Sequence, residues 1–393
     1  MLPDSETVSC AFLGFARKST IVLAAAHMED AMKISSGLKI AAIYGSVFLG
    51  AGFASGQELL QYFVNFGRIG IFGIIIAGLL FSFVGWAVLR ICQREGIKNY
   101  NLLMSHLFGK KLGNVMESLV AVFLFCLFVA MLAGAGATGY EAFGIPFSTS
   151  AVVTSVIVFI VLCFGLKGIV KVNLFLAPFM LIGGIVIGLY SYFSHSEPAF
   201  AIISLNYIGI AWFLSAIVYA SYNLVTGVPI LTATTVLITK KRDAIVGGMA
   251  GGAVITFLGI CMALPLFLHQ ASVITLEIPF LYIANLHGEI LRFLYLAVLI
   301  CAIMTTAACN AFAVCEWLMS CVNKLAARYN KHGEAASMLR PTRMKTAAAI
   351  CLLGVVFSHI GFSNIVAYVY PAFGFFGLFK IIVVLWHGFW YTK

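Results

Sequence analysis

Residues 50–58 read GAGFASGQE and lie inside an apolar stretch that runs from about Ile40 to Phe66. The glycines at positions 50, 52 and 56 lack the Cβ atom that favours helical dihedral angles, and each costs a helix interior up to about 1 kcal/mol relative to alanine. Lipid offers no partner to free peptide groups, so irregular backbone at membrane depth survives only against protein or a watery cavity. The sequence therefore predicts an interrupted membrane helix that faces a polar site, as in the binding sites of secondary transporters.

The composition is that of a membrane protein along the whole chain. Hydrophobic residues make up 62% of it, charged residues make up 10%, and the mean hydropathy is +1.05. Since roughly 20 apolar residues cross a bilayer as a helix, we expect an all-α protein with about ten transmembrane helices. A further short helix at 279–287 is expected on the outer surface. The expected spans are 40–66, 69–92, 115–139, 149–166, 172–193, 206–236, 244–268, 290–323, 346–360 and 364–389.

The basic residues predict the orientation of these spans. Cytoplasmic loops collect lysine and arginine, and here the basic residues fall in alternate connections, with only Arg68 and Arg292 on the opposite side. We expect a multi-pass protein of the cell membrane with both termini in the cytoplasm. The net charge of +10 follows from this topology and does not indicate nucleic-acid binding. The cytoplasmic set is Arg17, Lys18, Lys33, Lys39, Arg90, Arg94, Lys98, Lys110, Lys111, Lys167, Lys171, Lys240, Lys241, Arg242, Lys324, Arg328, Lys331, Arg340, Arg343, Lys345 and Lys393.

The N-terminal segment has mixed charge and differs from the rest. Its apolar run at 20–26 is too short to cross a membrane or to act as a signal sequence. We expect a disordered cytoplasmic tail at 1–36 and a transmembrane transporter domain at 37–393. Met32, followed by Lys33 and a polar segment, is an alternative start to Met1, and the sequence leaves both open.

A second interruption is expected in the sixth span. Apolar residues at 208–219 give way to the polar and glycine-containing run 221–227, and Pro229 opens a second apolar piece. Proline fits the start of a helix and glycine the end of one. Breaks near residues 50 and 223 divide the spans into two halves of five, at about 38–193 and 206–389. The pattern predicts a five-plus-five inverted repeat in which helices 1 and 6 are interrupted.

The motif VFLGAGFASGQE at 47–58, with this length and span pattern, resembles the bacterial YkvI-type membrane proteins, which are assigned as amino acid permeases of the amino acid-polyamine-organocation superfamily. The resemblance covers about residues 36–390. It implies the leucine-transporter-like fold, in which two inverted repeats hold the substrate at interrupted helices 1 and 6. It does not identify the substrate.

The resemblance places a substrate carboxylate at the first break. The superfamily's GxG corresponds to Gly50, Ala51 and Gly52, whose free N–H groups would bind it. The positive end of a half-helix that starts near Phe53 favours the same anion. The alternative is that these glycines only allow close helix packing, as the glycine pairs 247/251 and 248/252 of the seventh span are expected to do.

The second break is expected to complete the substrate site. Its free carbonyls would hold an ammonium group, and its aromatic rings would line an apolar pocket. Aromatic residues are common in this chain, with 34 Phe and 15 Tyr, so any one of them is an equally good candidate for packing. The candidate residues are Tyr219, Ser221, Tyr222 and Asn223.

A cation site is expected beside the first break. Ala302, Thr305 and Thr306 lie on one small, polar face of the eighth span. Resemblance to the superfamily's sodium-coupled members implies that the two threonine hydroxyls join the backbone carbonyls of Ser46 and Leu49, and oxygen ligands suit a hard cation. The alternative is that both threonines bond back to carbonyls one turn earlier.

Two carboxylates are expected at membrane depth, where an ionisable group is costly and usually functional. Glu58 follows the first break and could bind a substrate amine, a cation or a proton. Glu316 lies in the cytoplasmic half of the eighth span and is interpreted as an inner-gate partner of a basic residue such as Lys39. The alternative for Glu316 is a carboxylate that reaches headgroup water.

We therefore expect a secondary transporter that moves an amino acid or similar small zwitterion together with Na+ or H+ by alternating access. No cofactor is implied. The ten cysteines and eight histidines show no spacing typical of a metal site. The alternatives are a channel or a non-transporting sensor of the same fold. A membrane enzyme is the least favoured, since GxSxG and HExxH motifs are missing from the sequence. The sequence does not predict the substrate, the coupling ion, the stoichiometry or the oligomeric state.

Overall fold

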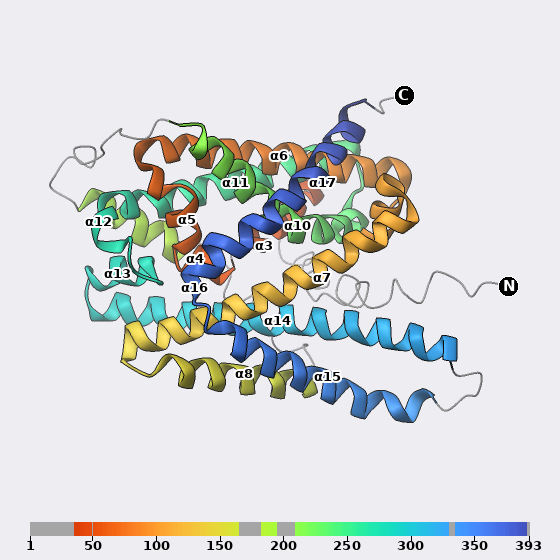
Figure 1. Cartoon of the computed structure of the whole chain (residues 1–393). Coiled ribbons are helices and arrows are strands. Elements are labelled where there is room, and N and C mark those ends of the chain that lie inside the picture. Colours follow the sequence, from red (N-terminus) through yellow and green to blue (C-terminus); the bar gives the residue numbers. More distant parts are fainter. Residues whose placement is uncertain (1–34, 49, 165–181, 195–208, 330–334, 391–393) are drawn as a thin grey trace.

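The computed structural model describes residues 35–48, 50–164, 182–194, 209–329 and 335–390, and these ranges are helical with short connections (Figure 1). Residues 1–34 of the expected tail, with both candidate starts, lie outside the described residues. So do Leu49 and the first half of the expected fifth span.

The first crossing is interrupted, as the glycines predicted. Its three pieces are α3 Ser36–Val47, α4 Ala51–Ala54 and α5 Gln57–Tyr62. Gly56 turns the chain from α4 into α5 with a φ of 81°, a left-handed conformation that glycine adopts without strain. A Cβ at this position would also lie 3.2 Å from the Leu266 side chain. Both the backbone and the packing therefore require glycine here.

The other expected spans coincide with helices. By length and hydropathy, six helices among the described residues could cross a membrane. The first expected span is broken, and others are shorter or only partly described, so this criterion does not confirm the expected number of crossings. The helices are η1 Val64–Ile69, α6 Gly70–Glu95, α7 Tyr100–Phe143, α8 Phe147–Phe164, Ile182–Phe193, α10 Ala211–Thr234, η2 Thr235–Leu237, α11 Lys241–Leu268, α12 Gln270–Val273, α13 Pro279–Asn285, α14 Glu289–Tyr329, α15 Ala335–Ser358, α16 Phe362–Asn364, the π-helix η3 Ile365–Val369 and α17 Tyr370–Trp390.

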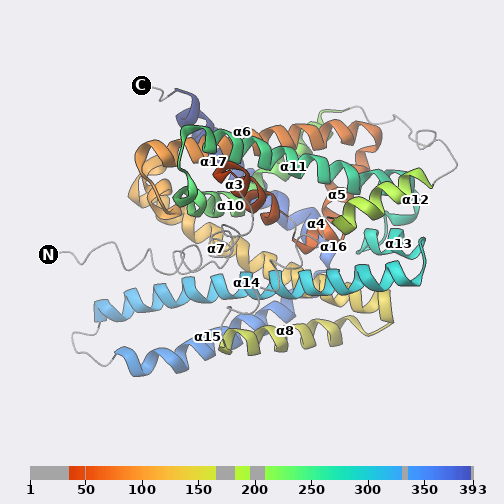
Figure 2. The ribbon, with the colours of Figure 1, turned by 180° about the vertical axis from the view of Figure 1, so that it is seen from behind.

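The helices form two packed groups (Figures 1 and 2). One group contains α3, α6, α10, α11 and α17, and the other contains α7, α8, α14 and α15. In both views α4 and α16 lie near each other between the groups. The interrupted first crossing therefore lies where the two groups meet.

Glycines on α11 allow close contact within the first group, as expected for the seventh span. A Cβ at Gly248 would overlap the Trp86 backbone, and one at Gly252 would overlap Ser82, both on α6. A Cβ at Gly251 would lie 2.5 Å from the Tyr44 ring of α3. Small residues let membrane helices approach each other in this way.

The expected break in the sixth span is wrong: α10 is one helix from Ala211 to Thr234, with Pro229 inside it. Two polar residues of the run bond to carbonyls of their own helix. Asn223 Nδ2 donates to Tyr219 O at 3.1 Å, and Thr226 Oγ1 donates to Asn223 O at 2.9 Å. These bonds let polar residues remain in a membrane helix. Proline has no N–H to donate to the Val225 carbonyl, so the irregularity is confined to one missing backbone bond.

The expected short helix before the eighth span exists as α13, and its place at the outer surface of the membrane stays a prediction. Phe280, Leu281 and Ile283 of this helix are buried. The Phe280 N–H donates to the Ser55 carbonyl at 2.9 Å, so α13 packs over the first break.

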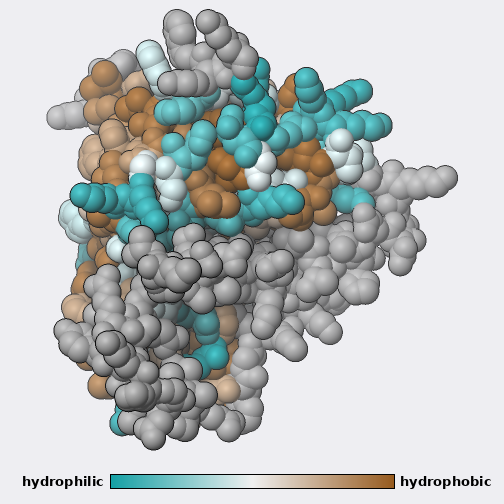
Figure 3. All heavy atoms as spheres, turned by 90° about the vertical axis from the view of Figure 1, so that its right-hand side faces the viewer, coloured by the Kyte–Doolittle hydropathy of each residue, from teal (hydrophilic) through white to brown (hydrophobic). Residues whose placement is uncertain are grey.

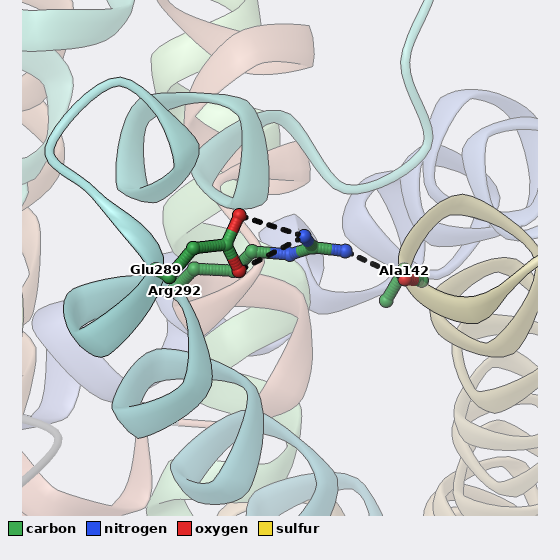
Figure 4. A network of polar contacts seen from close by, with 3 residues as sticks. All are labelled: Ala142, Glu289 and Arg292. Carbon is green, nitrogen blue, oxygen red and sulfur yellow. Dashed lines mark hydrogen bonds and ion pairs between the residues drawn. The ribbon is translucent and has the colours of Figure 1, made fainter.

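The two ends of the helix groups differ in chemistry. The end formed by the C-terminus of α6 and the start of α11 carries the exposed residues Arg94, Lys98, Lys240 and Lys241, and hydrophilic residues gather on this face (Figure 3). At the opposite end Arg292 of α14 pairs with Glu289 at 3.3 Å and donates to Ala142 O at 2.7 Å (Figure 4). The basic end is formed by connections that were expected to be cytoplasmic loops. That this end faces the cytoplasm stays a prediction.

Candidate functional site

The backbone carbonyls that follow the first break have protein partners. The Ser55 hydroxyl donates to Gly52 O, and the Tyr295 hydroxyl donates to Ala54 O, each at 2.9 Å. Tyr295 belongs to α14, so this bond joins the interrupted first crossing to the second helix group. The break therefore faces protein, as irregular backbone at membrane depth must.

Glu58 lies at the centre of the site. Its side chain is on α5, is only 7% exposed, and folds back so that a Cβ on Gly52 would overlap Oε1. The carboxyl faces the Tyr222 hydroxyl and the Asn223 amide of α10. Neither Glu58 Oε2 nor the Tyr222 hydroxyl makes a hydrogen bond of good geometry. A buried carboxyl with an unpartnered oxygen is costly in a membrane protein and marks a functional site.

Four tyrosines surround this carboxyl. The Tyr222 ring lies 5.4 Å from Tyr62 of α5, 5.5 Å from Tyr219 and 4.9 Å from Tyr370 of α17. All four are at most 4% exposed. The Tyr62 hydroxyl donates to Val366 O at 3.0 Å, whereas the Tyr370 hydroxyl, like that of Tyr222, has no partner. We name Glu58 and these four residues the tyrosine cluster.

The π-helix η3 and the preceding α16 fix one side of the tyrosine cluster. Gln57 Nε2 donates to Ser363 Oγ at 2.7 Å, and Gln61 Nε2 donates to the same oxygen at 3.2 Å. The Gln57 Oε1 atom is buried without a partner. A π-helix frequently marks a functional position, and here it contributes Val366 to the site.

A small cavity lies beside the cluster. It is lined mainly by apolar side chains, including Phe53, Phe63 and Phe81 together with Tyr219, and has room for about one water molecule. Sites for small molecules usually enclose roughly 300–1,000 Å3. The structure is therefore closed around this region.

The structure brings the expected substrate residues of both spans together. Phe53 is buried, Tyr219, Tyr222 and Asn223 face Glu58 or its tyrosines, and the buried Ser221 hydroxyl has no partner. Gly50 is half-buried, and a Cβ there would meet nothing within 4 Å. The side chain of Ala51 lies outside the described residues. Substrate binding by any of these residues stays a prediction.

The expected cation site is only partly described. Ala302 and Thr305 are buried and Thr306 is half-buried on α14. Thr305 Oγ1 donates to Ala302 O at 3.1 Å, which is the bond to an earlier carbonyl that was the alternative interpretation. The Ser46 side chain and all of Leu49 lie outside the described residues. The cation site stays a prediction.

Glu316 has a basic partner on α15. Its Oε1 lies 2.6 Å from Arg343 Nη2, with the two side chains 26% and 41% exposed. The expected partner type is found, with Arg343 in place of the suggested Lys39. A pair this exposed contributes little stability, about 1 kcal/mol or less.

The sequence analysis missed several buried groups. Tyr62 and Tyr370 of the cluster were not selected, because tyrosines are common in this chain and helix rotation decides which of them face inward. Lys380 of α17 is 2% exposed, and its Nζ donates to the Tyr100 hydroxyl at 3.3 Å. A lysine inside an apolar span is itself a signal of function and could have been found.

Across the described ranges, no group of three or more His, Cys, Asp or Glu side chains could hold a metal ion.

No family model matches the chain. It is 26% identical over 350 residues to the uncharacterized membrane protein YkvI of Bacillus subtilis, covering 87% of this chain and 93% of that protein. It is 25% identical over 344 residues to the uncharacterized protein YyaD of the same species, covering 87% and 94%.

Solved structures are similar over most of the chain. The transporter MhsT in complex with L-phenylalanine has a TM-score of 0.60 and 15% identity, covering 92% of this chain and 90% of that one. A manganese transporter of Eremococcus coleocola has a TM-score of 0.59 and 14% identity, covering 90% and 80%. The chain has the leucine-transporter-like fold. The proteins with this likeness are membrane transporters and not enzymes.

A sodium-coupled sialic acid symporter shows the same likeness, with a TM-score of 0.54 and 12% identity over 98% of this chain and 84% of that one. At these identities the likeness shows the fold alone, and the cargoes of these proteins differ from one another. The tyrosine cluster lies at the interrupted first helix of this fold.

Proposed function

We propose that this protein is a secondary active transporter of the cell membrane, which moves an amino acid or another small amine-bearing solute by alternating access. The observation that carries the proposal is the tyrosine cluster: an interrupted first helix places a buried, partly unpartnered carboxyl between two packed helix groups. A site between groups that can rock against each other is reachable from one side of the membrane at a time. The transporters that share the fold support the same function.

Coupling to a cation is part of the proposal. Either Na+ binds between Thr305, Thr306 and the carbonyls of Ser46 and Leu49, or a proton binds at Glu58. Oxygen ligands from an unwound helix suit Na+, and a buried carboxyl suits a proton.

Counterflow in reconstituted vesicles tests this function. Vesicles loaded with an unlabelled solute that stabilises the purified protein should accumulate the same labelled solute from outside, and a Na+ or H+ gradient should drive net uptake. A channel would show no stimulation by internal solute. A sensor would bind the solute without moving it, so binding without counterflow would contradict transport.

A further inference from the structure

The side-chain carboxylate of Glu58 lies at the first break, where the carboxylate of a substrate was expected to bind. Glu58 Oε1 occupies the space beside Gly52 that a Cβ would need. Glycine at this position therefore makes room for the protein's own carboxyl. A substrate carboxylate at the same place would bring two like charges together in a buried site, which disfavours its binding.

The surroundings of Glu58 are suited to a positive charge. No ion pair of the described residues involves Glu58, and burial raises the cost of leaving a charged oxygen unpartnered. A ligand that donates N–H groups to Oε2 would remove this cost. The Tyr222 and Tyr370 hydroxyl oxygens, both buried and unpartnered, can accept further N–H groups.

The rings of the cluster add a second attraction for a cation. Tyr222 has three tyrosine rings within 5.5 Å, centroid to centroid. The faces of aromatic rings attract ammonium groups. Here the rings contact one another, so an ammonium group would have to enter between them.

An inorganic divalent cation fits this site poorly. One carboxyl and neutral phenols provide fewer charged oxygens than divalent cations usually take in proteins, and Glu58 belongs to no metal-binding group of the described residues. The apolar lining of the small cavity beside Tyr219 would instead suit the carbon skeleton of an organic cation once the site opens.

We propose that the tyrosine cluster binds a small organic amine that carries no carboxylate, with its ammonium group held by Glu58 and its carbon skeleton directed toward the cavity beside Tyr219. The inference rests on the proposed transport function and narrows its substrate class, given there as an amino acid or another small amine-bearing solute, to amines that lack a carboxylate.

Matched pairs of ligands test the proposal on the purified full-length protein. The pairs are phenethylamine with phenylalanine and putrescine with ornithine, each titrated by its effect on thermal unfolding. At least one amine should bind roughly tenfold or more tightly than its carboxylated partner. Equal or tighter binding of the carboxylated partners, or no binding of any amine, would overturn the inference.

Glu58→Gln separates a binding role from a packing role. It keeps the size of the side chain and removes its charge, so amine binding should fall by roughly tenfold or more while the protein still unfolds cooperatively. The exposed carboxyl of Glu95 provides the matched control, since Glu95→Gln should leave binding unchanged. Unchanged amine binding in Glu58→Gln, or Glu58-dependent stabilisation by sodium or potassium chloride with no added effect of amines, would overturn the proposal.

Counterflow with the same ligands distinguishes the proposed transport function from the proposed amine site. If a carboxylated ligand binds and shows counterflow, the transport function stands and the amine inference is wrong. If an amine binds in a Glu58-dependent way without counterflow, the amine site stands and transport is wrong.

Discussion

The carboxyl of Glu58 packs against Gly52, six residues earlier in the same interrupted helix, so closely that a Cβ on Gly52 would overlap Oε1. The relationship joins the two features on which the site depends: the glycine-rich break and the buried charge that follows it. It also explains why Gly52 of the motif requires its small size, whereas Gly50 does not.

Gly52→Ala should displace the Glu58 carboxyl and weaken ligand binding by roughly tenfold or more, because the added methyl group takes its space. Gly50→Ala is the matched control, since a Cβ there meets nothing within 4 Å. Titration of both variants by thermal unfolding measures the effect. Equal affinities in the two variants would show that the Gly52 contact is unimportant.

Tyr295→Phe should destabilise the protein by about 1–3 kcal/mol, because it leaves the buried Ala54 carbonyl without its hydrogen bond while keeping the ring. The bond joins α14 to the first crossing, so its loss should also speed opening of the site. Thermal unfolding and the rate of ligand exchange measure the two effects. Tyr140→Phe, at a side chain that is 65% exposed, should change neither.

Thr306→Ala should reduce the stimulation of ligand binding by Na+ if α14 provides a cation ligand, and Thr306→Ser, which keeps the hydroxyl, should restore it. Binding titrations with Na+ and with K+ at the same concentration measure the effect. Full Na+ stimulation in Thr306→Ala would exclude this hydroxyl as a ligand, whereas no Na+ stimulation in the unsubstituted chain would favour the proton alternative at Glu58.

The carboxyl of Glu277, in the connection before α13, should make the stability of the folded protein depend on pH. Burial raises the pKa of its carboxyl above the ordinary value, and the Phe362 N–H that donates to Oε2 at 3.2 Å opposes the shift. The folded state therefore binds the proton more tightly than the unfolded state. The contribution of this group to stability is present below the ordinary pKa and is lost as the pH rises through the raised pKa.

Glu277→Gln removes this titration and keeps an acceptor for the Phe362 N–H. The variant should unfold at a higher temperature than the unsubstituted chain at about pH 7 and at the same temperature at about pH 4. Glu95→Gln, at an exposed carboxyl, should show no such difference. A lower unfolding temperature of Glu277→Gln at neutral pH would contradict the stated sign.

The sequence predicted the first break because three glycines and a serine inside an apolar stretch are costly in any regular membrane helix. The same reasoning failed for α10, where Asn223 and Thr226 bond to carbonyls of their own helix. Polar residues in a span thus indicate a break only when the same segment also contains residues, such as several glycines, that disfavour a helical backbone. Whether a side chain turns back to its own helix depends on rotamers that the sequence pattern does not contain.

The site was predictable in part. Glu58 could be selected because a carboxylate at membrane depth is rare. Tyr62 and Tyr370 could not, since they come from two helices whose rotation is set by packing. The π-helix before Tyr370 shifts the register of that helix, and no sequence pattern predicted it.

The central claim is that the first break lines a site which opens to both sides of the membrane. Labelling of Gly50→Cys by a membrane-impermeant thiol reagent tests it most directly, because this position has open space and the unsubstituted chain reports the background of the native cysteines. The account predicts labelling above background when the reagent is applied from either side of oriented vesicles, and slower labelling when a ligand occupies the tyrosine cluster. Labelling no faster than background from both sides would contradict it.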